Sequence, residues 1–147
     1  MTKPTITLDT NVIVSGAILS HGVPFSILSL WKQREFTLVL SPALIDEATE
    51  TLSRLKIIKQ YDVSVERIKK LVFRLKENSI IIIPTNISSA IVIRDKKDAV
   101  ILGTALSGRV DYLITGDKDL LVLDGNIHIG KLRIVIPRQF LDSFDRK

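Results

Sequence analysis

TITLDTN, residues 5–11, places an apolar, β-branched run directly before an aspartate and a polar helix start. Such a run predicts a buried strand over residues 5–8. Asp9 and Thr10 end that strand and can cap a helix that begins near Asn11. This step from strand to acid to helix guides the interpretation of the rest of the chain.

Strands and helices alternate along the remaining sequence. Strands are predicted at residues 37–40, 79–83, 111–114 and 132–136. Helices are predicted at residues 25–33, 42 to about 55, 65–77, 97–107 and 138–144. Nearly continuous apolar strands between amphipathic helices predict an α/β fold with a central, mainly parallel sheet covered on both faces. The isoleucines of residues 79–83 suit a central strand, and residues 1–147 are expected to form a single domain.

Length and composition limit the functional classes. The 147 residues are 46% hydrophobic and 25% charged, as in globular domains. The absence of cysteine excludes a thiol nucleophile and thiolate zinc sites, and two histidines are too few for a histidine metal cage. A net charge of +5 favours a polyanionic partner such as nucleic acid. The sequence has neither a signal-peptide core nor a run of about 20 apolar residues, which predicts a cytoplasmic protein without membrane contact.

Acidic residues follow the predicted strands. Ligands of open parallel sheets bind beyond the carboxyl ends of the strands. Asp9 follows the first strand and Asp117 follows the strand at 111–114, although each alone could equally be a helix cap or a turn residue. Asp98 is in line with the apolar stripe of its helix, so its carboxylate is expected to point toward the core or the sheet edge. Its alternative role is that of a first-turn acid favoured by the helix dipole.

The helix that begins at residue 42 supplies a further acid. Glu47 borders its buried face, whereas Glu50 is expected to pair with Arg54 on the outer face. Four acids are therefore expected at one edge of the sheet: Asp9, Glu47, Asp98 and Asp117. Two carboxylates about 4 Å apart repel by roughly 4 kcal/mol at an effective dielectric near 20. Oxygen ligands select a hard cation, so the group predicts Mg²⁺ or Mn²⁺.

Four motifs, in order, resemble those of PIN-domain ribonucleases, most closely the subgroup of VapC-like toxins of toxin–antitoxin pairs. The motifs are LDTNV at residues 8–12, the acidic pair at 46–47, KDAVIL at 97–102 and TGDKDLL at 115–121. The resemblance spans nearly the whole chain. It implies a Rossmann-like, three-layer domain, a Mg²⁺- or Mn²⁺-dependent endoribonuclease activity on RNA, and an antitoxin protein as partner.

The resemblance also assigns roles to individual residues. It places the catalytic and metal-binding acids at Asp9, Glu47, Asp98 and Asp117, with Asp119 as an auxiliary metal ligand. Asn11 and Thr115 match polar positions that would orient ligands or water. Asp95 competes with Asp98 for the third motif, and the spacing to the apolar stripe favours Asp98.

Basic side chains flank these acids and are candidates to contact the RNA backbone, although each suits a solvent-exposed surface equally well. They are Arg94, Lys96, Lys97 and Lys118. No side chain is an obvious general base, so the activation of water is assigned to the metal. The alternative is an RNA- or protein-binding module that keeps the fold without catalysis. The complete acidic set argues against it, because clustered negative charge repels a polyanion.

Two other patterns are weaker. Residues 125–131 fit GxxxxGK, but Leu132 stands where a magnesium-binding Ser or Thr belongs, and the segment precedes a strand, so we interpret it as a loop. Asp9-Thr10-Asn11 is also similar to the start of haloacid-dehalogenase-type phosphatases, in which Asp9 would be a nucleophile. That chemistry needs an acid where Asn11 stands, and it would leave a covalent intermediate on Asp9.

Apolar helical positions bear on assembly. Residues 25–30 and 68–75 supply more apolar positions than one side of a sheet obviously needs, and Phe73 falls outside the apolar stripe of its helix. An exposed apolar patch favours association, and twofold dimers are the commonest solution. The sequence therefore predicts a homodimer through these helices.

Overall fold

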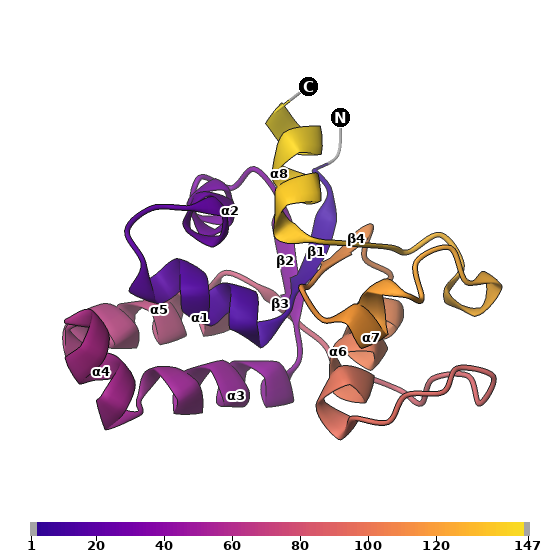
Figure 1. Ribbon diagram of the computed structural model, residues 1–147, viewed down its shortest axis with the longest axis horizontal. Coiled ribbons are helices and arrows are strands. Elements are labelled where there is room, and N and C mark those ends of the chain that lie inside the picture. The colour runs from indigo at the N-terminus through magenta and orange to yellow at the C-terminus, as the bar shows by residue number, and fades with distance from the viewer. Residues whose placement is uncertain (1–2, 146–147) are drawn as a thin grey trace.

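Five parallel strands form the centre of the protein (Figure 1). The computed structural model describes residues 3–145, and for Leu55 and Lys56 the backbone alone. The sheet has the order β3-β2-β1-β4-β5. Its strands are β1 (Thr5–Leu8), β2 (Thr37–Leu40), β3 (Ile80–Ile81), β4 (Tyr112–Ile114) and β5 (Arg133–Val135). The predicted α/β fold is confirmed, and the strands pair in parallel throughout the sheet.

Helices cover both faces of this sheet. In Figure 1, α1 to α5 lie on one side, α6 and α7 lie on the other, and α8 lies beside the start of β1. The helices are α1 (Thr10–Ile18), α2 (Val23–Lys32), α3 (Pro42–Leu52), α4 (Leu55–Tyr61), α5 (Val65–Glu77), α6 (Lys96–Ser107), α7 (Lys118–Leu121) and α8 (Pro137–Asp145). Within residues 3–145, no single helix has the length and apolar composition to cross a membrane; α1 and α2 meet that test only together, across a bend of 93°.

Strand register determines which side chains meet at the carboxyl edge of the sheet. β1 lies between β2 and β4, and Leu8 pairs with Ile114 at the end of β4. The backbone N–H of Asp9 donates to the carbonyl of Ile114 over 3.0 Å. The first residues beyond both strands, Asp9 and Thr115, are therefore neighbours, although 106 positions separate them in the sequence.

The isoleucine run at residues 79–83 is not a central strand, and that prediction is wrong. The structure forms only the two-residue strand β3 there, at the outer edge of the sheet beside β2. Ile80 is 51% exposed and Ile81 is 41% exposed. An apolar run identifies a strand but not its place in the sheet, because the pairing partners determine which strand lies in the middle.

The helix predicted from residue 42 to about 55 ends earlier, at Leu52. Arg54 adopts an extended backbone conformation and precedes α4, a helix that was not predicted from the sequence. Because Arg54 lies outside α3, it is not on the same helical face as Glu50. Among the ion pairs of residues 3–145, the expected pair between these two residues does not occur.

Residues 125–131, the GxxxxGK segment, lie in the connection between α7 and β5. They contain a single 3-10 turn at Ile127–Ile129 and lead into a strand, in agreement with the loop interpretation. Asp124 anchors this connection by accepting hydrogen bonds from Arg133 Nε (3.1 Å) and the N–H of Ile134 (2.9 Å). Burial would raise the pKa of Asp124, but the hydrogen bonds from Arg133 and Ile134 outweigh it and lower the pKa.

Two helical glycines give a matched prediction of stability. A Cβ on Gly16 would lie 2.7 Å from the Pro24 carbonyl oxygen and 2.8 Å from Leu28, so Gly16→Ala should lower the free energy of unfolding by about 1–3 kcal/mol. A Cβ on Gly103 would come no closer than 3.5 Å to any neighbour, so Gly103→Ala should raise it by about 0.5–1 kcal/mol. Urea denaturation of both variants checks the opposite signs. Equal effects would contradict the close approach of α1 and α2.

Candidate active site

Asp9 occupies the end of β1 and caps α1. Its Oδ1 atom accepts a hydrogen bond from the backbone N–H of Asn11 (3.0 Å), and its Oδ2 atom accepts one from Thr115 Oγ1 (2.7 Å). The residue is only 5% exposed. Asp9 therefore serves as a helix cap and at the same time presents a buried carboxylate at the carboxyl edge of the sheet.

Thr115 connects the ends of β1 and β4. Besides donating to Asp9, its hydroxyl oxygen accepts a hydrogen bond from the backbone N–H of Asp117 (3.0 Å). Its side chain is completely buried. Thr115 thus contacts two acidic residues at once and fixes their relative position. Asn11 contributes through its backbone N–H, and the residue itself is exposed.

The first turn of α6 separates the two competing aspartates. Asp95 is exposed and caps the helix, since its Oδ1 atom accepts the N–H of Lys97 (2.8 Å). Asp98 is 5% exposed and points inward, toward α7. The helical phase of Asp98 relative to the apolar stripe predicts this orientation.

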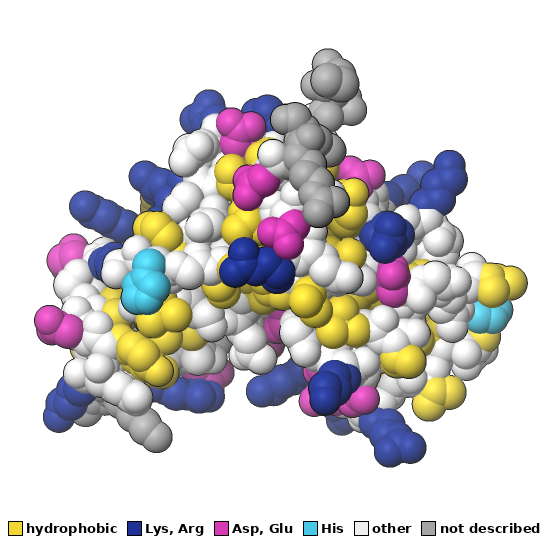
Figure 2. Space-filling model, turned by 45° about the horizontal axis from the view of Figure 1, so that its top comes forward, with side chains coloured by type: hydrophobic (Ala, Val, Ile, Leu, Met, Phe, Trp, Pro, Cys, Tyr) yellow, Lys and Arg dark blue, Asp and Glu magenta, His cyan; other side chains and the backbone are white. Residues whose placement is uncertain are grey.

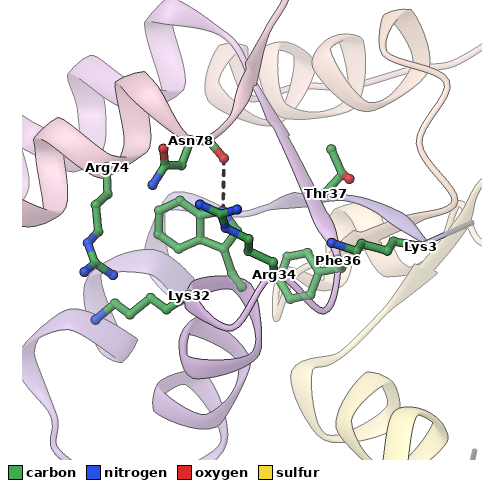
Figure 3. Close-up of a pocket in the computed structure, with 8 residues that line it drawn as sticks. Lys3, Lys32, Arg34, Phe36, Thr37, Arg74 and Asn78 are labelled. Atoms are coloured by element: carbon green, nitrogen blue, oxygen red, sulfur yellow. Dashed lines mark hydrogen bonds between the residues drawn. The ribbon is translucent and has the colours of Figure 1, made fainter.

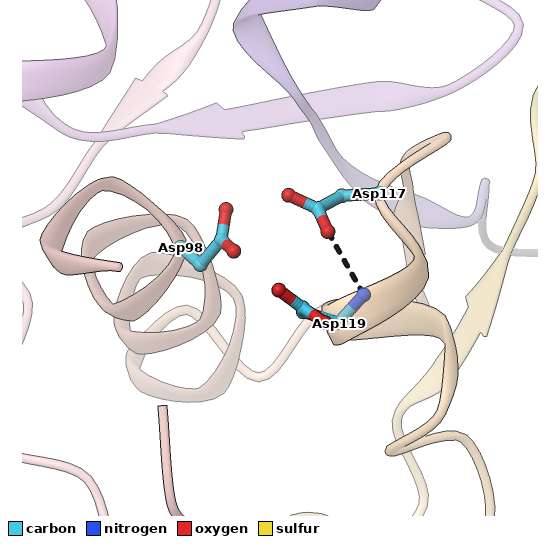
Figure 4. A group of neighbouring side chains, drawn as sticks. All are labelled: Asp98, Asp117 and Asp119. Carbon is cyan, nitrogen blue, oxygen red and sulfur yellow. Dashed lines mark hydrogen bonds between the residues drawn. The ribbon is translucent and has the colours of Figure 1, made fainter. Parts of the chain in front are cut away.

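Three carboxylates meet at this edge of the sheet. Asp98 comes from α6, while Asp117 caps α7 and Asp119 lies in its first turn (Figure 4). One carboxylate oxygen of each lies within 4.8 Å of the others. We call Asp98, Asp117 and Asp119 the acidic cluster. The Asp119 N–H donates to Asp117 Oδ1 (2.8 Å), which holds the two α7 acids on the same side.

The electrostatics of the acidic cluster disfavour three full negative charges. Burial, followed by a hydrogen bond and charge repulsion from Asp117 and the charges of Asp95 and Asp9, raises the pKa of Asp98 to about 7. Near neutral pH the Asp98 carboxyl is therefore protonated in about half of the molecules. A divalent cation would supply the compensating charge in its place.

Glu47 lies outside the acidic cluster. It is half-buried on α3, and its Oε1 atom is 3.5 Å from the Nζ atom of Lys97 at the start of α6. Of the four acids expected together, Asp98 and Asp117 lie in the acidic cluster. Asp9 is linked to Asp117 through the hydroxyl of Thr115. Glu47 is separate from them and contacts the start of α6 through its ion pair with Lys97. Lys97, a candidate for RNA contact, thus forms an ion pair with Glu47, and its side chain is 70% exposed. The other three basic candidates are exposed: Arg94, Lys96 and Lys118.

A buried hydroxyl pair behind the site was not predicted. Thr104 Oγ1 lies 2.9 Å from Ser41 Oγ and 2.7 Å from the carbonyl of Val100. Both hydroxyl residues are completely buried. This contact fastens α6, which carries Asp98, to the carboxyl end of β2. The only signal in the sequence is a threonine inside the otherwise apolar stripe of residues 101–105.

The donor chemistry of the site fits a hard divalent cation. The acidic cluster offers carboxylate oxygens only, which is the ligand set that suits Mg²⁺ and Mn²⁺. Asp98, Asp117 and Asp119 are the residues that would hold such an ion, with Asp9 next to them. Among the described residues, no comparable group of carboxylates lies at the GxxxxGK segment.

The titration of Asp98 predicts how stability depends on pH without metal. Its pKa of about 7 in the folded chain exceeds the value of 3.8 for a free side chain, so the folded state binds more protons between these two pH values. Stability should fall as pH rises from about 4 to about 7, by on the order of 2 kcal/mol. Urea denaturation in chelator at pH 5 and pH 8 measures this difference in the free energy of unfolding. Asp98→Asn should flatten the difference, and a wild type equally stable at both values would contradict the prediction.

Comparison with known proteins identifies the family of the chain. A family model described as PIN domain matches residues 5–119. The uncharacterized protein MJ1680 of Methanocaldococcus jannaschii is 30% identical over 153 aligned positions, which cover 98% of this chain and 94% of that protein. One chain in the crystal structure of VapBC2 from Rickettsia felis, solved with a DNA fragment from the VapBC2 promoter, shares the fold with a TM-score of 0.54. The two chains are 16% identical, and the match covers 90% of this chain and 98% of the other. Because the family model matches most of its length, the chain belongs to the PIN-domain family.

Proposed function

We propose that this protein is a divalent-metal-dependent endoribonuclease that hydrolyses RNA phosphodiester bonds. The observation that carries the proposal is the convergence of the Asp98, Asp117 and Asp119 carboxylates beyond the ends of parallel strands. Membership of the PIN-domain family supports hydrolysis of nucleic acid as the reaction class. The specificity for RNA and the choice of Mg²⁺ or Mn²⁺ are parts of the proposal.

The residues of the site have three proposed roles: holding the cation, positioning the acids and contacting the RNA. Asp98, Asp117 and Asp119 would hold the cation, which would activate water and stabilise negative charge on the departing oxygen. Thr115 keeps Asp9 and Asp117 in place through its two hydrogen bonds. Arg94, Lys96 and Lys118 stand at the starts of α6 and α7, where they would neutralise the RNA backbone.

Cleavage of a mixed RNA pool tests this function directly. Purified protein with Mg²⁺ or Mn²⁺ should cleave the pool, chelator should abolish cleavage, and renewed addition of the metal should restore it. Cleavage that persists in chelator would contradict the role of the metal. Binding of RNA without cleavage under any metal would favour the inactive binding module instead.

A toxin–antitoxin pair is the biological setting that we propose. The supporting observations are the shared fold with a chain of VapBC2 and the motif resemblance to VapC-like toxins. An antitoxin would then be the protein partner, and the cytoplasm the place of action. Co-expression with the product of the neighbouring reading frame should suppress toxicity and RNA cleavage, whereas persistent activity would count against that product as the antitoxin.

The homodimer remains a prediction, and its apolar basis is smaller than expected. Most of the apolar side chains of residues 25–30 and 68–75 are buried or half-buried in the chain itself. Phe73 is 65% exposed and basic residues of α5 surround it. On the face that Figure 2 shows, apolar side chains form separate patches between charged and polar ones. A mass near 16.5 kDa by light scattering would contradict the homodimer.

A further inference from the structure

A basic groove lies at the opposite edge of the sheet from the acidic cluster. It consists of three adjoining cavities of about 260, 240 and 590 Å³ that share Lys32 and Arg74. The groove runs from the amino ends of β1 and β2, at Lys3 and Thr37, along the end of α2 and the exposed side of α5. Figure 3 shows the first cavity, in which Lys3, Lys32, Arg34 and Arg74 surround the opening.

The charge of the chain is concentrated in this basic groove. Besides the four cations of the first cavity, α5 contributes Arg67, Lys69 and Lys70, and the single acidic residue of the lining is Glu66. The chain has 21 basic and 16 acidic side chains. The groove therefore holds seven of the basic side chains and one of the acidic ones, and 14 basic and 15 acidic side chains lie elsewhere. The groove accounts for the entire positive net charge of the protein.

The seven cations of the groove lack counterions among the described side chains. Within residues 3–145, none of them lies within ion-pair distance of a carboxylate. Partial burial, and then the neighbouring Arg74 and Arg67, lower the pKa of Lys32. Gathering like charges in this way destabilises the folded chain, so an anion that binds between them would be favoured.

The shape of the groove favours a chain of phosphates over a single one. Arg67, Lys70 and Arg74 recur at helical spacings of three and four, which repeats positive charge along one face of α5. The exposed ring of Phe73 lies in the same cavity as Lys69 and Lys70. Repeated cations beside an exposed aromatic ring are the two elements by which proteins hold single-stranded nucleic acid.

We propose that the basic groove is a second RNA-binding surface, which holds the phosphate backbone of a single-stranded segment remote from the cleavage site. That the polyanion is the RNA substrate rests on the proposed nuclease function. A second copy of the chain is disfavoured as the occupant, because a twofold contact through α5 would bring seven cations toward seven others.

The position of the groove determines which substrates it affects. β1 and β2 have four residues each and so span about 13 Å. An RNA that reaches from the acidic cluster to the groove must therefore pass around the protein. A short oligonucleotide bound at the acidic cluster cannot occupy both. The groove should strengthen binding of long RNA and leave short substrates unaffected.

Charge reversal on α5 tests the proposal. Arg67→Glu with Lys70→Glu changes two exposed groove residues, and Lys131→Glu with Arg138→Glu changes the net charge equally outside the groove. Binding of fluorescent long polyuridine in chelator, without cleavage, should weaken at least about tenfold in the groove variant and far less in the control. The dependence of log affinity on log salt should become shallower by about 0.7 for each phosphate that the variant no longer neutralises. Urea denaturation verifies that both variants fold.

The single tryptophan provides a local signal. Trp31 lines the first cavity, and its Nε1 atom donates to the carbonyl of Asn78 (3.3 Å, Figure 3). Its fluorescence should change on binding long polyuridine, and this change should shrink in the groove variant at the same RNA concentration. Equal RNA affinity of the groove variant and the wild type would overturn the proposal, as would equal reductions in affinity in both charge-reversed variants.

The remaining outcomes separate the alternatives. If polyglutamate binds more tightly than polyuridine and changes Trp31 fluorescence, an acidic protein segment is the occupant and the proposal is wrong. If light scattering shows a dimer that the groove substitutions dissociate, a second copy is the occupant and the proposal is equally wrong. Long RNA that binds through the groove but is never cleaved with metal would refute the nuclease function alone. Cleavage of long RNA by the groove variant at the wild-type KM would refute the groove alone.

Discussion

Asp98→Asn is expected to reduce metal-dependent RNA cleavage by at least about a hundredfold while the protein remains folded. The substitution keeps the size of the side chain but replaces one of the three carboxylates of the acidic cluster with a neutral amide. Because the Asp98 carboxylate is buried beside Asp117, its loss also relieves repulsion in the metal-free protein. Cleavage rates measure the loss of activity, and urea denaturation at pH 8 measures the free energy of unfolding. The free energy of unfolding should not decrease.

A neighbouring aspartate provides the matched control. Asp95 caps α6 from an exposed position, and asparagine is an equally good cap. Asp95→Asn should therefore keep nearly full activity. Unchanged turnover in the Asp98 variant would remove this residue from the active site, whereas loss of activity in both variants would indicate a requirement for negative charge near α6 in general.

Glu47→Gln should also abolish cleavage, whereas Glu50→Gln should leave it nearly intact. Glu47 is half-buried and faces the start of α6 through Lys97, while Glu50 is exposed. The two residues lie three positions apart on α3, so one helix supplies both the test and its control. Single-turnover cleavage with saturating Mg²⁺ compares them. The reverse outcome would refute a role for Glu47 at the site.

Lys97→Met separates two explanations for an effect at Glu47. If Glu47 only positions α6 through its ion pair, removing Lys97 should be as damaging as removing Glu47. If the Glu47 carboxylate acts at the metal, the Lys97 variant should keep most of its activity, because it frees that carboxylate. The ratio of the cleavage rates of the Lys97→Met and Glu47→Gln variants decides between these explanations.

The sequence predicted those features that local patterns determine. Helical phase distinguished Asp98 from Asp95, because the apolar residues three and four positions later fix the buried face of α6. The carboxyl ends of parallel strands meet at one edge, which is why Asp9 and Asp117 were expected near each other. The first expectation needs only the residue's own helix, and the second needs only the parallel direction that alternating strands and helices predict.

Features that depend on tertiary pairing could not be predicted. Nothing in the isoleucine run indicates that β1, and not β3, lies in the middle of the sheet. The family resemblance assigned Asp119 as an auxiliary metal ligand, but periodicity could not place it, because the four residues of α7 are too few to show a helical period. The basic groove arises because α2 and α5 meet at their C-terminal ends, whereas the sequence reveals only an overall excess of positive charge.

The pairing of β1 with β4 has a consequence for synthesis of the protein. Asp9 leaves the ribosome more than a hundred positions ahead of Thr115 and Asp117, which complete its surroundings. Chains elongate at roughly 5–20 residues per second, so each nascent molecule spends several seconds without an assembled site. An RNA-cleaving protein built this way would leave the messenger that encodes it untouched until Thr115 and Asp117 have been synthesised.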